Sequence, residues 1–275
     1  MTTQATVPRD LADRVALVLG AGSIGPGWGI GKACAARFAQ AGATVVAADV
    51  DLAAAERAVR EIESLGAQAE ALSVDVLDDG AVADAVAGVA ARYGRLDVLH
   101  CNVGLGKAGD GAATTPDEWR RFSDANLTSV HVATQAALPP MRRQGSGVLL
   151  ATSSIAGLRY PGYQHLAYGA TKAGLNHLMR LLAVENGPHG VRSNTIVAGL
   201  IDTPRIEKTL AGRYGQGGLE EMRAARAGQV PLGRMGSAWD VAEVALFLAS
   251  DRAAYVTGTE IVVDGGLSGT VRQAL

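Results

Sequence analysis

Residues 15–31 read VALVLGAGSIGPGWGIG, an apolar run followed by a segment that carries six glycines. The run 15–19 predicts a buried parallel strand, because such strands read as continuous apolar stretches. Residues 32–41 then follow a helical pattern. Between a strand and a helix, a glycine turn can bind a pyrophosphate, since glycines admit close backbone approach and the first N–H groups of the helix face the phosphates. A glycine-rich stretch is also typical of a flexible surface loop, so the remainder of the chain must decide.

Strand-like and helix-like segments alternate along the rest of the chain. Strands are predicted at 44–48, 69–74, 96–101, 148–152, 193–197 and 259–263, and helices at 52–65, 81–93, 116–141, from about 167, and at 239–250. Such alternation is typical of right-handed βαβ units. We therefore expect an α/β fold with a doubly wound parallel sheet, which is a Rossmann fold with three layers (α/β/α). Ligands of these sheets bind beyond the carboxyl ends of the strands.

The chain of 275 residues suits one large domain, and no linker, low-complexity tract or internal repeat divides it. We therefore expect a single domain over 1–275. Residues 204–230 are rich in arginine and glycine, with weak helical signals and no evident partner strand. Long irregular segments of compact domains tend to be lids or binding loops, so this segment is expected to cover the substrate.

Composition and charge exclude several classes of function. The net charge is −2 and no basic stripe occurs, so neither nucleic acid nor an anionic membrane surface is an expected partner. No apolar run approaches the roughly 20 residues of a membrane span, and the polar residues 1–10 do not resemble a secretory signal. Cys34 and Cys101 do not suggest a disulfide scaffold, which favours a cytoplasmic location. The five histidines show no ligand spacing, so no metal site is predicted.

Tyr168 and Lys172 are the first candidates for chemistry. Residues four apart on a helix share one face, so a phenol and an ammonium would lie side by side. A unit positive charge about 4 Å away is worth roughly 4 kcal/mol near a protein surface, enough to lower the phenol pKa by about three units. A tyrosine tuned in this way can act as a general acid or base on an alcohol or carbonyl oxygen. The pair by itself is more often a core tyrosine and a surface lysine on an amphipathic helix, so the surrounding residues must decide.

Asp49 closes the second predicted strand and predicts the choice of cofactor. An acid at this place can accept the hydrogens of both ribose hydroxyls, and its charge repels a 2′-phosphate. The next residue is Val50, and residues 21–23 supply no basic side chain that could neutralise such a phosphate. Each unit of like charge about 4 Å away costs roughly 4 kcal/mol at an effective dielectric near 20. The sequence therefore predicts NAD(H) in preference to NADP(H).

Residues 15 to about 266 resemble the short-chain dehydrogenase/reductase family in its single-domain form. The matching motifs are the glycine loop ending Gly29-Ile30-Gly31, Asp75-Val76, Cys101-Asn102-Val103-Gly104, Asn126, Ser154, the Tyr168/Lys172 pair, Ala198-Gly199 and Val263-Asp264-Gly265-Gly266. The chain departs from the family pattern at Cys101 and Val103, where the family has asparagine and alanine, and at Ala198, where it has proline. The glycine loop is also longer than in the family, by residues 24–28.

This resemblance implies a role for each residue of the catalytic set. Tyr168 would be the general acid/base, and Lys172 would lower its pKa and bind the nicotinamide ribose. Ser154 would hold the substrate oxygen. Asn126 would anchor a water that connects Lys172 to solvent.

The resemblance also implies a set of cofactor contacts. Asp75 and Val76 would meet the adenine, while Ile201 and Thr203 would bind the carboxamide that orients the nicotinamide. The complete set of expected cofactor-binding residues is Gly20, Ser23, Gly29, Ile30, Asp49, Asp75, Val76, Asn102, Gly104, Tyr168, Lys172, Ile201 and Thr203.

We therefore predict an NAD(H)-dependent oxidoreductase that interconverts a secondary alcohol and a ketone, with a small-molecule substrate. The family resemblance also implies a homotetramer. Its interfaces are expected at the small-residue face of the Tyr168 helix and at the C-terminal glycine-rich strand.

Two alternatives stay open. The lengthened loop is similar to that of enoyl-thioester reductases of the same superfamily, but those enzymes place tyrosine and lysine farther apart, and position 165 here is His165. The other alternative is a cofactor-binding scaffold without turnover, although such proteins usually lose one of Ser154, Tyr168 and Lys172.

Two hypotheses concern the substrate. The first is that at least one arginine of the expected lid faces an anionic group of the substrate. The alternative is that all four are solvated. These arginines are Arg205, Arg213, Arg223 and Arg226. Tyr163 and His165 either touch the substrate or belong to a solvated loop.

Overall fold

A parallel sheet lies at the centre of the protein. The computed structural model describes residues 9–107, 111–162, 164–206 and 218–270. Within these residues the sheet has seven strands in the order β3-β2-β1-β4-β5-β6-β9, and every neighbouring pair is parallel. The strands are β1 Val15–Leu19, β2 Thr44–Asp49, β3 Ala69–Ser73, β4 Val98–Cys101, β5 Gly147–Ser154, β6 Val191–Ala198 and β9 Glu260–Val263. The predicted doubly wound parallel sheet is confirmed.

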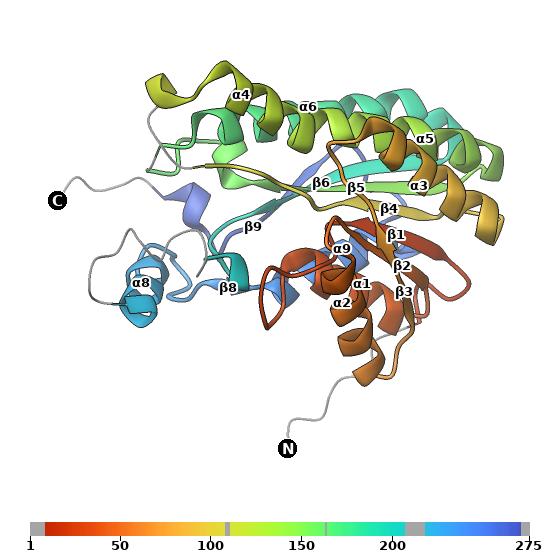
Figure 1. Cartoon of the computed structure of the whole chain (residues 1–275), viewed down its shortest axis with the longest axis horizontal. Coiled ribbons are helices and arrows are strands. Elements are labelled where there is room, and N and C mark those ends of the chain that lie inside the picture. The colour runs from red at the N-terminus through yellow and green to blue at the C-terminus, as the bar shows by residue number, and fades with distance from the viewer. Residues whose placement is uncertain (1–8, 108–110, 163, 207–217, 271–275) are drawn as a thin grey trace.

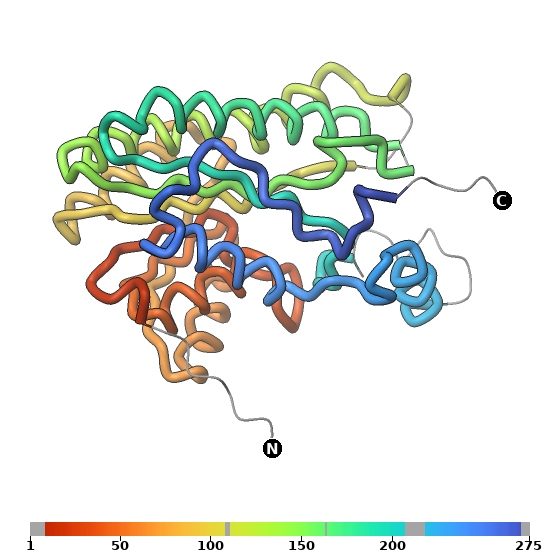
Figure 2. The backbone as a smooth tube through the Cα atoms, turned by 180° about the vertical axis from the view of Figure 1, so that it is seen from behind, coloured from red at the N-terminus to blue at the C-terminus, as the bar shows by residue number. Residues whose placement is uncertain are grey.

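The strand order reverses between β1 and β4. From β1 the chain builds outward to β2 and β3, returns to pair β4 with the other side of β1, and then builds outward again to β9. This switch point separates the loops that follow β1 and β4, which is where ligands of open α/β sheets bind. Seen from behind, the C-terminal strand β9 runs beside β6 at the edge of the sheet (Figure 2).

Helices cover both faces of the sheet. One layer contains α3 Asp79–Tyr93, α4 Pro116–Ser123, α5 Ser129–Gln144 and α6 Leu166–Asn186, and the other contains α1 Ile30–Gln40, α2 Leu52–Ser64 and α9 Ala238–Ala249 (Figure 1). The alternating pleat of β1 separates the two cores, because Ala16 and Val18 pack with α1 and α9 whereas Leu17 and Leu19 pack with α3 and α5. The three predicted layers are confirmed.

The helix predicted at 116–141 is present as helical backbone from Pro116 to Gln144, but it is not α-helical throughout. It consists of α4, five π-helical residues Asp124–Thr128, and α5. A π turn shifts the helix by one residue without interrupting its apolar pattern, so periodicity does not reveal it. Thr115 begins α4 with a capping box to Glu118.

The segment after β6 has more regular structure than the sequence predicted. The short strand β7 Ile201–Asp202 pairs in parallel with β8 Gly236–Ser237, and α8 is a helix over Gly218–Ala227. Met222 of α8 is buried in a separate small cluster with Leu200, Ile206, Val230 and Met235. Residues 207–217 of the expected lid lie outside the described residues.

No helix in the described part of the chain is long and apolar enough to cross a membrane. Among the same residues, no group of three or more His, Cys, Asp or Glu side chains could hold a metal ion.

Candidate active site

Tyr168 and Lys172 lie on the first turns of α6, as their spacing predicted. The Lys172 Nζ lies 5.7 Å from the centre of the Tyr168 ring. Lys172 is 2% exposed, and its Nζ donates to the carbonyl of Thr152 at 2.8 Å and to that of Val103 at 3.4 Å. Pairing between β4 and β5 ends at Cys101 and Ala151, so the carbonyl of Thr152 lies just beyond the last pair of residues. It accepts a hydrogen bond from the ammonium in place of one from β4.

Burial sets the acidity of Lys172. Burial and, to a smaller extent, the positive charge of Arg205 lower the pKa of Lys172 from 10.5 to about 7, against a still smaller opposite effect of Cys101.

Ser154 lies on a turn that packs against the same part of α6. It is the last residue of β5, and its Oγ accepts from the backbone N–H of Ala156 at 3.2 Å. A Cβ built on Gly157 would lie 2.7 Å from the carbonyl carbon of Lys172, and one built on Gly169 would lie 2.9 Å from the Ala156 oxygen. Glycine at these two places allows the Ser154 turn to lie against the helical turn that carries the pair.

The loop after β4 closes the other side of the pair. A Cβ built on Gly104 would lie 3.3 Å from the Lys172 Nζ, and one built on Gly106 would lie 2.8 Å from the Tyr168 Cδ2. Gly104 was predicted as a site residue, but Gly106 was missed. The sequence shows only that residue 106 is a glycine in a loop. Its contact with Tyr168 joins residues far apart in the sequence, so it could not be predicted.

Asn126 lies in the π-helical segment and holds this loop in place. Its side chain is fully buried; Oδ1 accepts from the Leu105 N–H at 2.6 Å, and Nδ2 donates to the Leu105 carbonyl at 2.7 Å and to the Thr171 Oγ1 at 2.9 Å. Thr171 in turn donates to the Tyr168 carbonyl at 2.9 Å. Asn126 therefore links the loop after β4 to the first turns of α6.

The glycine loop after β1 leaves donors for an anion. Gly29 precedes α1 without a side-chain cap, so the first N–H groups of the helix lack intrahelical acceptors. The Ser23 Oγ is buried and has no hydrogen-bond partner. A Cβ built on Gly31 would overlap the Gly20 carbonyl, to which the Asn102 Nδ2 donates at 2.9 Å. This donor set and the close backbone packing fit the diphosphate of a dinucleotide.

Asp49 closes β2 beside the glycine loop. Its Oδ2 accepts from the Gly22 N–H at 3.0 Å, and its Oδ1 accepts from the Asp51 N–H at 3.2 Å. The next residue, Val50, is 62% exposed and carries no charge that could neutralise a phosphate beside the carboxylate. The Asp49 carboxylate thus lies where the loop and the carboxyl end of β2 meet, which fits a ribose with two free hydroxyls.

Two further predicted cofactor segments follow β3 and β6. Asp75 is exposed and accepts from the Leu77 N–H at 2.9 Å, while Val76 packs partly buried against the core. Ile201 is buried in β7, and the carbonyl of Thr203 accepts from the Ile206 N–H at 2.9 Å.

The lid arginines differ in their surroundings. Arg223 forms an ion pair with Asp202 at 3.0 Å, and Arg226 is 8% exposed on the face of α8 that also buries Met222. Arg205 is exposed and acts electrostatically on Lys172. Arg213 lies outside the described residues.

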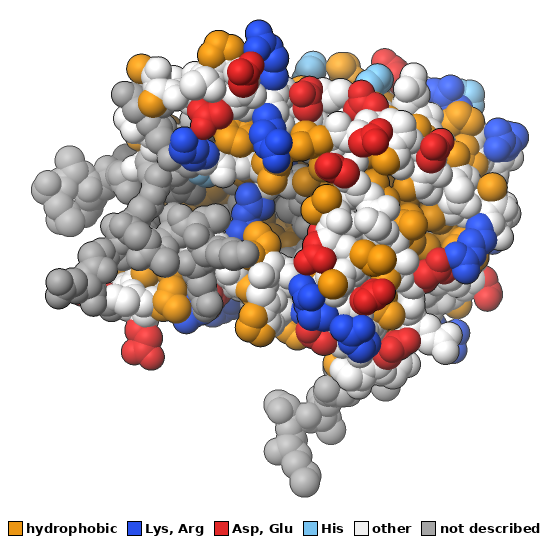
Figure 3. Space-filling model, in the orientation of Figure 1, with side chains coloured by type: hydrophobic (Ala, Val, Ile, Leu, Met, Phe, Trp, Pro, Cys, Tyr) orange, Lys and Arg blue, Asp and Glu red, His pale blue; other side chains and the backbone are white. Residues whose placement is uncertain are grey.

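His165 borders Tyr168, with ring centres 5.1 Å apart in an edge-to-face arrangement. Tyr163, the other residue of that hypothesis, lies outside the described residues. Figure 3 shows that the face drawn there is hollowed between the two helical layers.

Comparison with known proteins agrees with this fold. Residues 25–268 match the family described as Enoyl-(Acyl carrier protein) reductase. The 3-oxoacyl-[acyl-carrier-protein] reductase FabG of Thermotoga maritima is 35% identical over 257 residues, which cover 94% of this chain and 98% of that protein. A solved putative short-chain dehydrogenase/reductase from Burkholderia xenovorans superposes with a TM-score of 0.91 at 40% identity, over 96% of this chain and 99% of that chain. A 7α-hydroxysteroid dehydrogenase, solved with NADH and 7-oxo glycochenodeoxycholic acid, superposes with a TM-score of 0.84 at 30% identity, over 97% of this chain and 98% of that chain.

These likenesses extend over nearly the whole chain. On this evidence, the protein belongs to the short-chain dehydrogenase/reductase family of nicotinamide-dependent oxidoreductases.

Proposed function

We propose that this protein is an NAD(H)-dependent oxidoreductase that interconverts a secondary alcohol and a ketone. The observation that carries the proposal is the buried Lys172, whose Nζ is held by the Thr152 carbonyl one helical turn from Tyr168. Burying an ammonium is costly, so its place beside a phenol in a loop-lined site favours a functional role over a structural one.

The proposed chemistry assigns a proton path to this chain's own residues. The nicotinamide, when bound, accepts or supplies the hydride. Ser154 donates its hydroxyl hydrogen to the substrate oxygen and holds it. Tyr168 takes the proton from the alcohol oxygen in oxidation, or returns it to the carbonyl oxygen in reduction. While Lys172 is protonated, its positive charge favours the phenolate form of Tyr168. Asn126 fixes the loop after β4 against the first turns of α6.

We propose that the predicted cofactor residues hold NAD(H). Ser23, Gly29 and Ile30 would bind the diphosphate at the start of α1, and Asp49 the adenosine ribose. The remaining contacts would be made by Gly20, Asp75, Val76, Asn102, Gly104, Tyr168, Lys172, Ile201 and Thr203. The hydroxysteroid dehydrogenase solved with NADH supports this cofactor by analogy.

The matched family description makes an enoyl reductase the second candidate. The four-residue spacing of Tyr168 and Lys172 favours carbonyl chemistry, and so does the relative named for reduction of a 3-oxoacyl group. A cofactor-binding scaffold is the third candidate, and the presence of Ser154, Tyr168 and Lys172 argues against it.

Absorbance of the reduced nicotinamide distinguishes the three candidates. The assay combines the purified protein with NADH or NADPH and panels of ketones and 2-enoyl thioesters, and with the oxidised cofactors and secondary alcohols. We expect turnover of alcohols or ketones. Turnover of enoyl thioesters alone would favour the enoyl reductase, and cofactor binding without any turnover would favour the scaffold.

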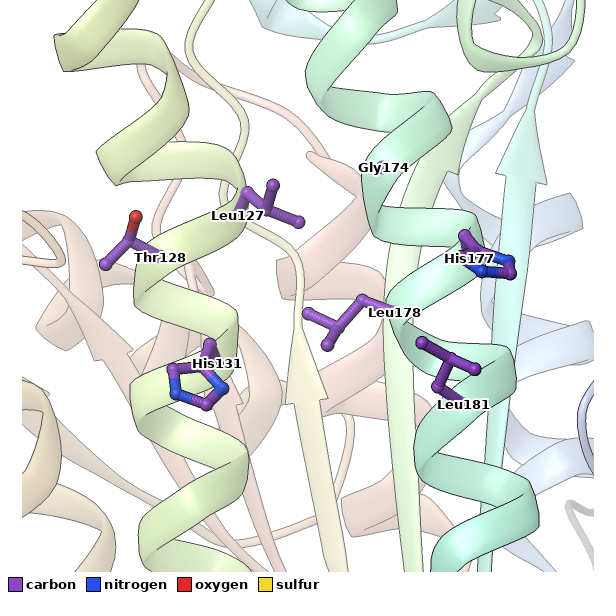
Figure 4. A pocket seen from close by; sticks show the side chains of 7 residues that line it. All are labelled: Leu127, Thr128, His131, Gly174, His177, Leu178 and Leu181. Atoms are coloured by element: carbon purple, nitrogen blue, oxygen red, sulfur yellow. The ribbon is translucent and has the colours of Figure 1, made fainter.

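We further propose one domain over 1–275, with the segment 204–230 bordering the substrate, and a homotetramer in the cytoplasm. Cys34 and Cys101 are buried free thiols, which suits a reducing compartment. An apolar hollow of about 390 Å³ between α5 and α6 supports an interface on this outer face (Figure 4). Its lining residues are Leu127, Thr128, His131, Gly174, His177, Leu178 and Leu181.

A further inference from the structure

The loop extension, residues 24–28, has no role in the proposed mechanism. It leaves the glycine loop at Ser23 and returns at Gly29, and these two residues lie close together. A Cβ built on Gly29 would lie 3.8 Å from the Ser23 Oγ and 3.7 Å from the Gly22 carbonyl. The base of the extension is therefore formed by the residues that are proposed to bind the diphosphate.

Trp28 attaches the extension to the body of the protein. Its ring centre lies 4.6 Å from that of Trp239 on α9, at an angle of 51°, and the Lys32 Nζ lies 4.7 Å from the Trp28 ring centre. Lys32 is only 2% exposed and forms an ion pair with Glu61 of α2 at 2.7 Å. Aromatic pairs and desolvated cations over an indole are among the stronger side-chain contacts, so Trp28 is a firm point of attachment.

The partner ring, Trp239, is fixed as well. The Arg37 guanidinium lies 4.8 Å from its ring centre and forms an ion pair with Glu243 at 2.7 Å. Trp239 also follows the capping residue Ser237, which belongs to β8. Through these contacts α1, α2 and α9 together hold Trp28.

The middle of the extension reaches the other end of the proposed cofactor site. A Cβ built on Gly27 would lie 3.3 Å from the Pro204 Cγ, and one built on Gly25 would lie 3.7 Å from the Pro204 Cβ. Gly27 has φ +98°, a conformation that favours glycine. Pro204 directly follows Thr203, which is proposed to bind the carboxamide. The extension thus spans from the diphosphate end of the site to the nicotinamide end.

We propose that Trp28 is a positioning residue that holds the loop extension between these two ends, so that both are preorganised for the cofactor. The inference rests on the proposed function. A site that is ordered before binding does not lose conformational freedom when the cofactor binds, which lowers the dissociation constant. Loss of the ring should therefore weaken cofactor binding and leave the chemical step intact.

The test is calorimetric titration of the full-length protein with NADH, or with NADPH if the wild type binds it more tightly. Trp28→Ala is expected to raise Kd about tenfold, and Trp28→Phe, which keeps an aromatic face for Lys32 and Trp239, to stay within about threefold. Trp119→Ala is the matched control, since Trp119 is 44% exposed on α4. At saturating cofactor, kcat should change by less than about threefold while KM for the cofactor follows Kd.

An unchanged Kd in a folded Trp28→Ala protein would overturn the role of Trp28 and leave the proposed function standing. A wild type that binds neither cofactor would contradict both. If Trp28→Ala does not fold, Lys32→Met decides the matter, because it removes the cation and keeps the apolar stem. We expect Lys32→Met to raise Kd about threefold, and an unaltered Kd there would likewise overturn the inference.

Discussion

The ammonium of Lys172 is held by two backbone carbonyls inside the fold. The Thr152 carbonyl is available to it because β4 ends at Cys101, opposite Ala151, whereas β5 continues to Ser154, and Gly104 leaves room for the Nζ. A sequence pattern gives the spacing of Tyr168 and Lys172, but burial of the lysine and its effect on the pKa come from strands distant in the chain.

The first prediction concerns Lys172 and pH. Its pKa in the folded protein, about 7, lies below the ordinary 10.5, so the unfolded chain binds a proton that the folded protein lacks between these values. Stability therefore rises with pH from about 7 to 10.5, and the contribution is lost as the pH falls through about 7. Lys172→Met should show a flatter rise across this window in urea denaturation at a series of pH values.

The control for this measurement is Lys107→Met, whose side chain is 71% exposed. Burial raises the pKa of the thiols of Cys34 and Cys101, which makes stability fall with rising pH. Both thiols are present in the wild type and in the variants, so the comparison between them removes this opposing effect. If the pH dependence of wild type and Lys172→Met coincided, Lys172 would not be deprotonated on folding.

The second prediction concerns cofactor choice. A 2′-phosphate would meet the Asp49 carboxylate, and a third of the roughly 4 kcal/mol expected at 4 Å already disfavours NADP(H) by about tenfold. Asp49→Ala combined with Val50→Arg should shift the preference toward NADP(H). The measurement is kcat/KM with both cofactors. Equal or better efficiency of the wild type with NADP(H) would show that Asp49 does not lie at the ribose.

At the scale of elements, the sequence predicted the strands and most helices, and it failed where tertiary contacts override local pattern. The π-helical residues Asp124–Thr128 carry the same apolar spacing as a continuous helix, but the buried amide of Asn126 bonds the loop after β4. The strand pair β7 and β8 is only two residues long in each member, too short for an alternating pattern to register. The glycine loop could be predicted from the sequence because its strand, its glycines and its helix are neighbours in the chain, whereas binding of a cofactor there stays a prediction.

The third prediction belongs to the loop after β4. A Cβ on Gly106 would lie 2.8 Å from Tyr168, so Gly106→Ala must displace either the loop or the phenol. Since a misplacement of about 1 Å can cost on the order of a hundredfold, we expect kcat to fall by at least about tenfold. Steady-state kinetics at saturating cofactor measure this change.

Gly88→Ala is the matched control for Gly106→Ala. Gly88 lies inside α3, and a Cβ built there meets nothing within 4 Å. The substitution should leave kcat unchanged and stabilise the helix by about 0.5–1 kcal/mol. If Gly106→Ala behaved in the same way as Gly88→Ala, the loop would not constrain Tyr168.

For the whole molecule, the sheet order explains how residues from five segments can meet. Parallel strands bring the loops after β1, β2, β4, β5 and β6 to one edge, and the reversal between β1 and β4 separates the loops that would otherwise collide. The family resemblance predicted this meeting point, and three contacts refine it: Lys172 with Thr152, Asn126 with Leu105, and Gly106 with Tyr168. The attachment of the loop extension by Trp28 and Trp239 was not predicted, because the two rings are far apart in the sequence.

We propose that Tyr168 transfers the proton in alcohol–ketone interconversion, and the variant Tyr168→Phe tests this role. The substitution removes the phenolic hydroxyl and keeps the ring against His165 and Gly106. Turnover of the best substrate and the Kd for the cofactor are measured on the same preparation. We expect kcat to fall by about 10²–10⁴-fold while Kd stays within about threefold. Turnover within a few-fold of wild type, with the cofactor bound, would contradict it.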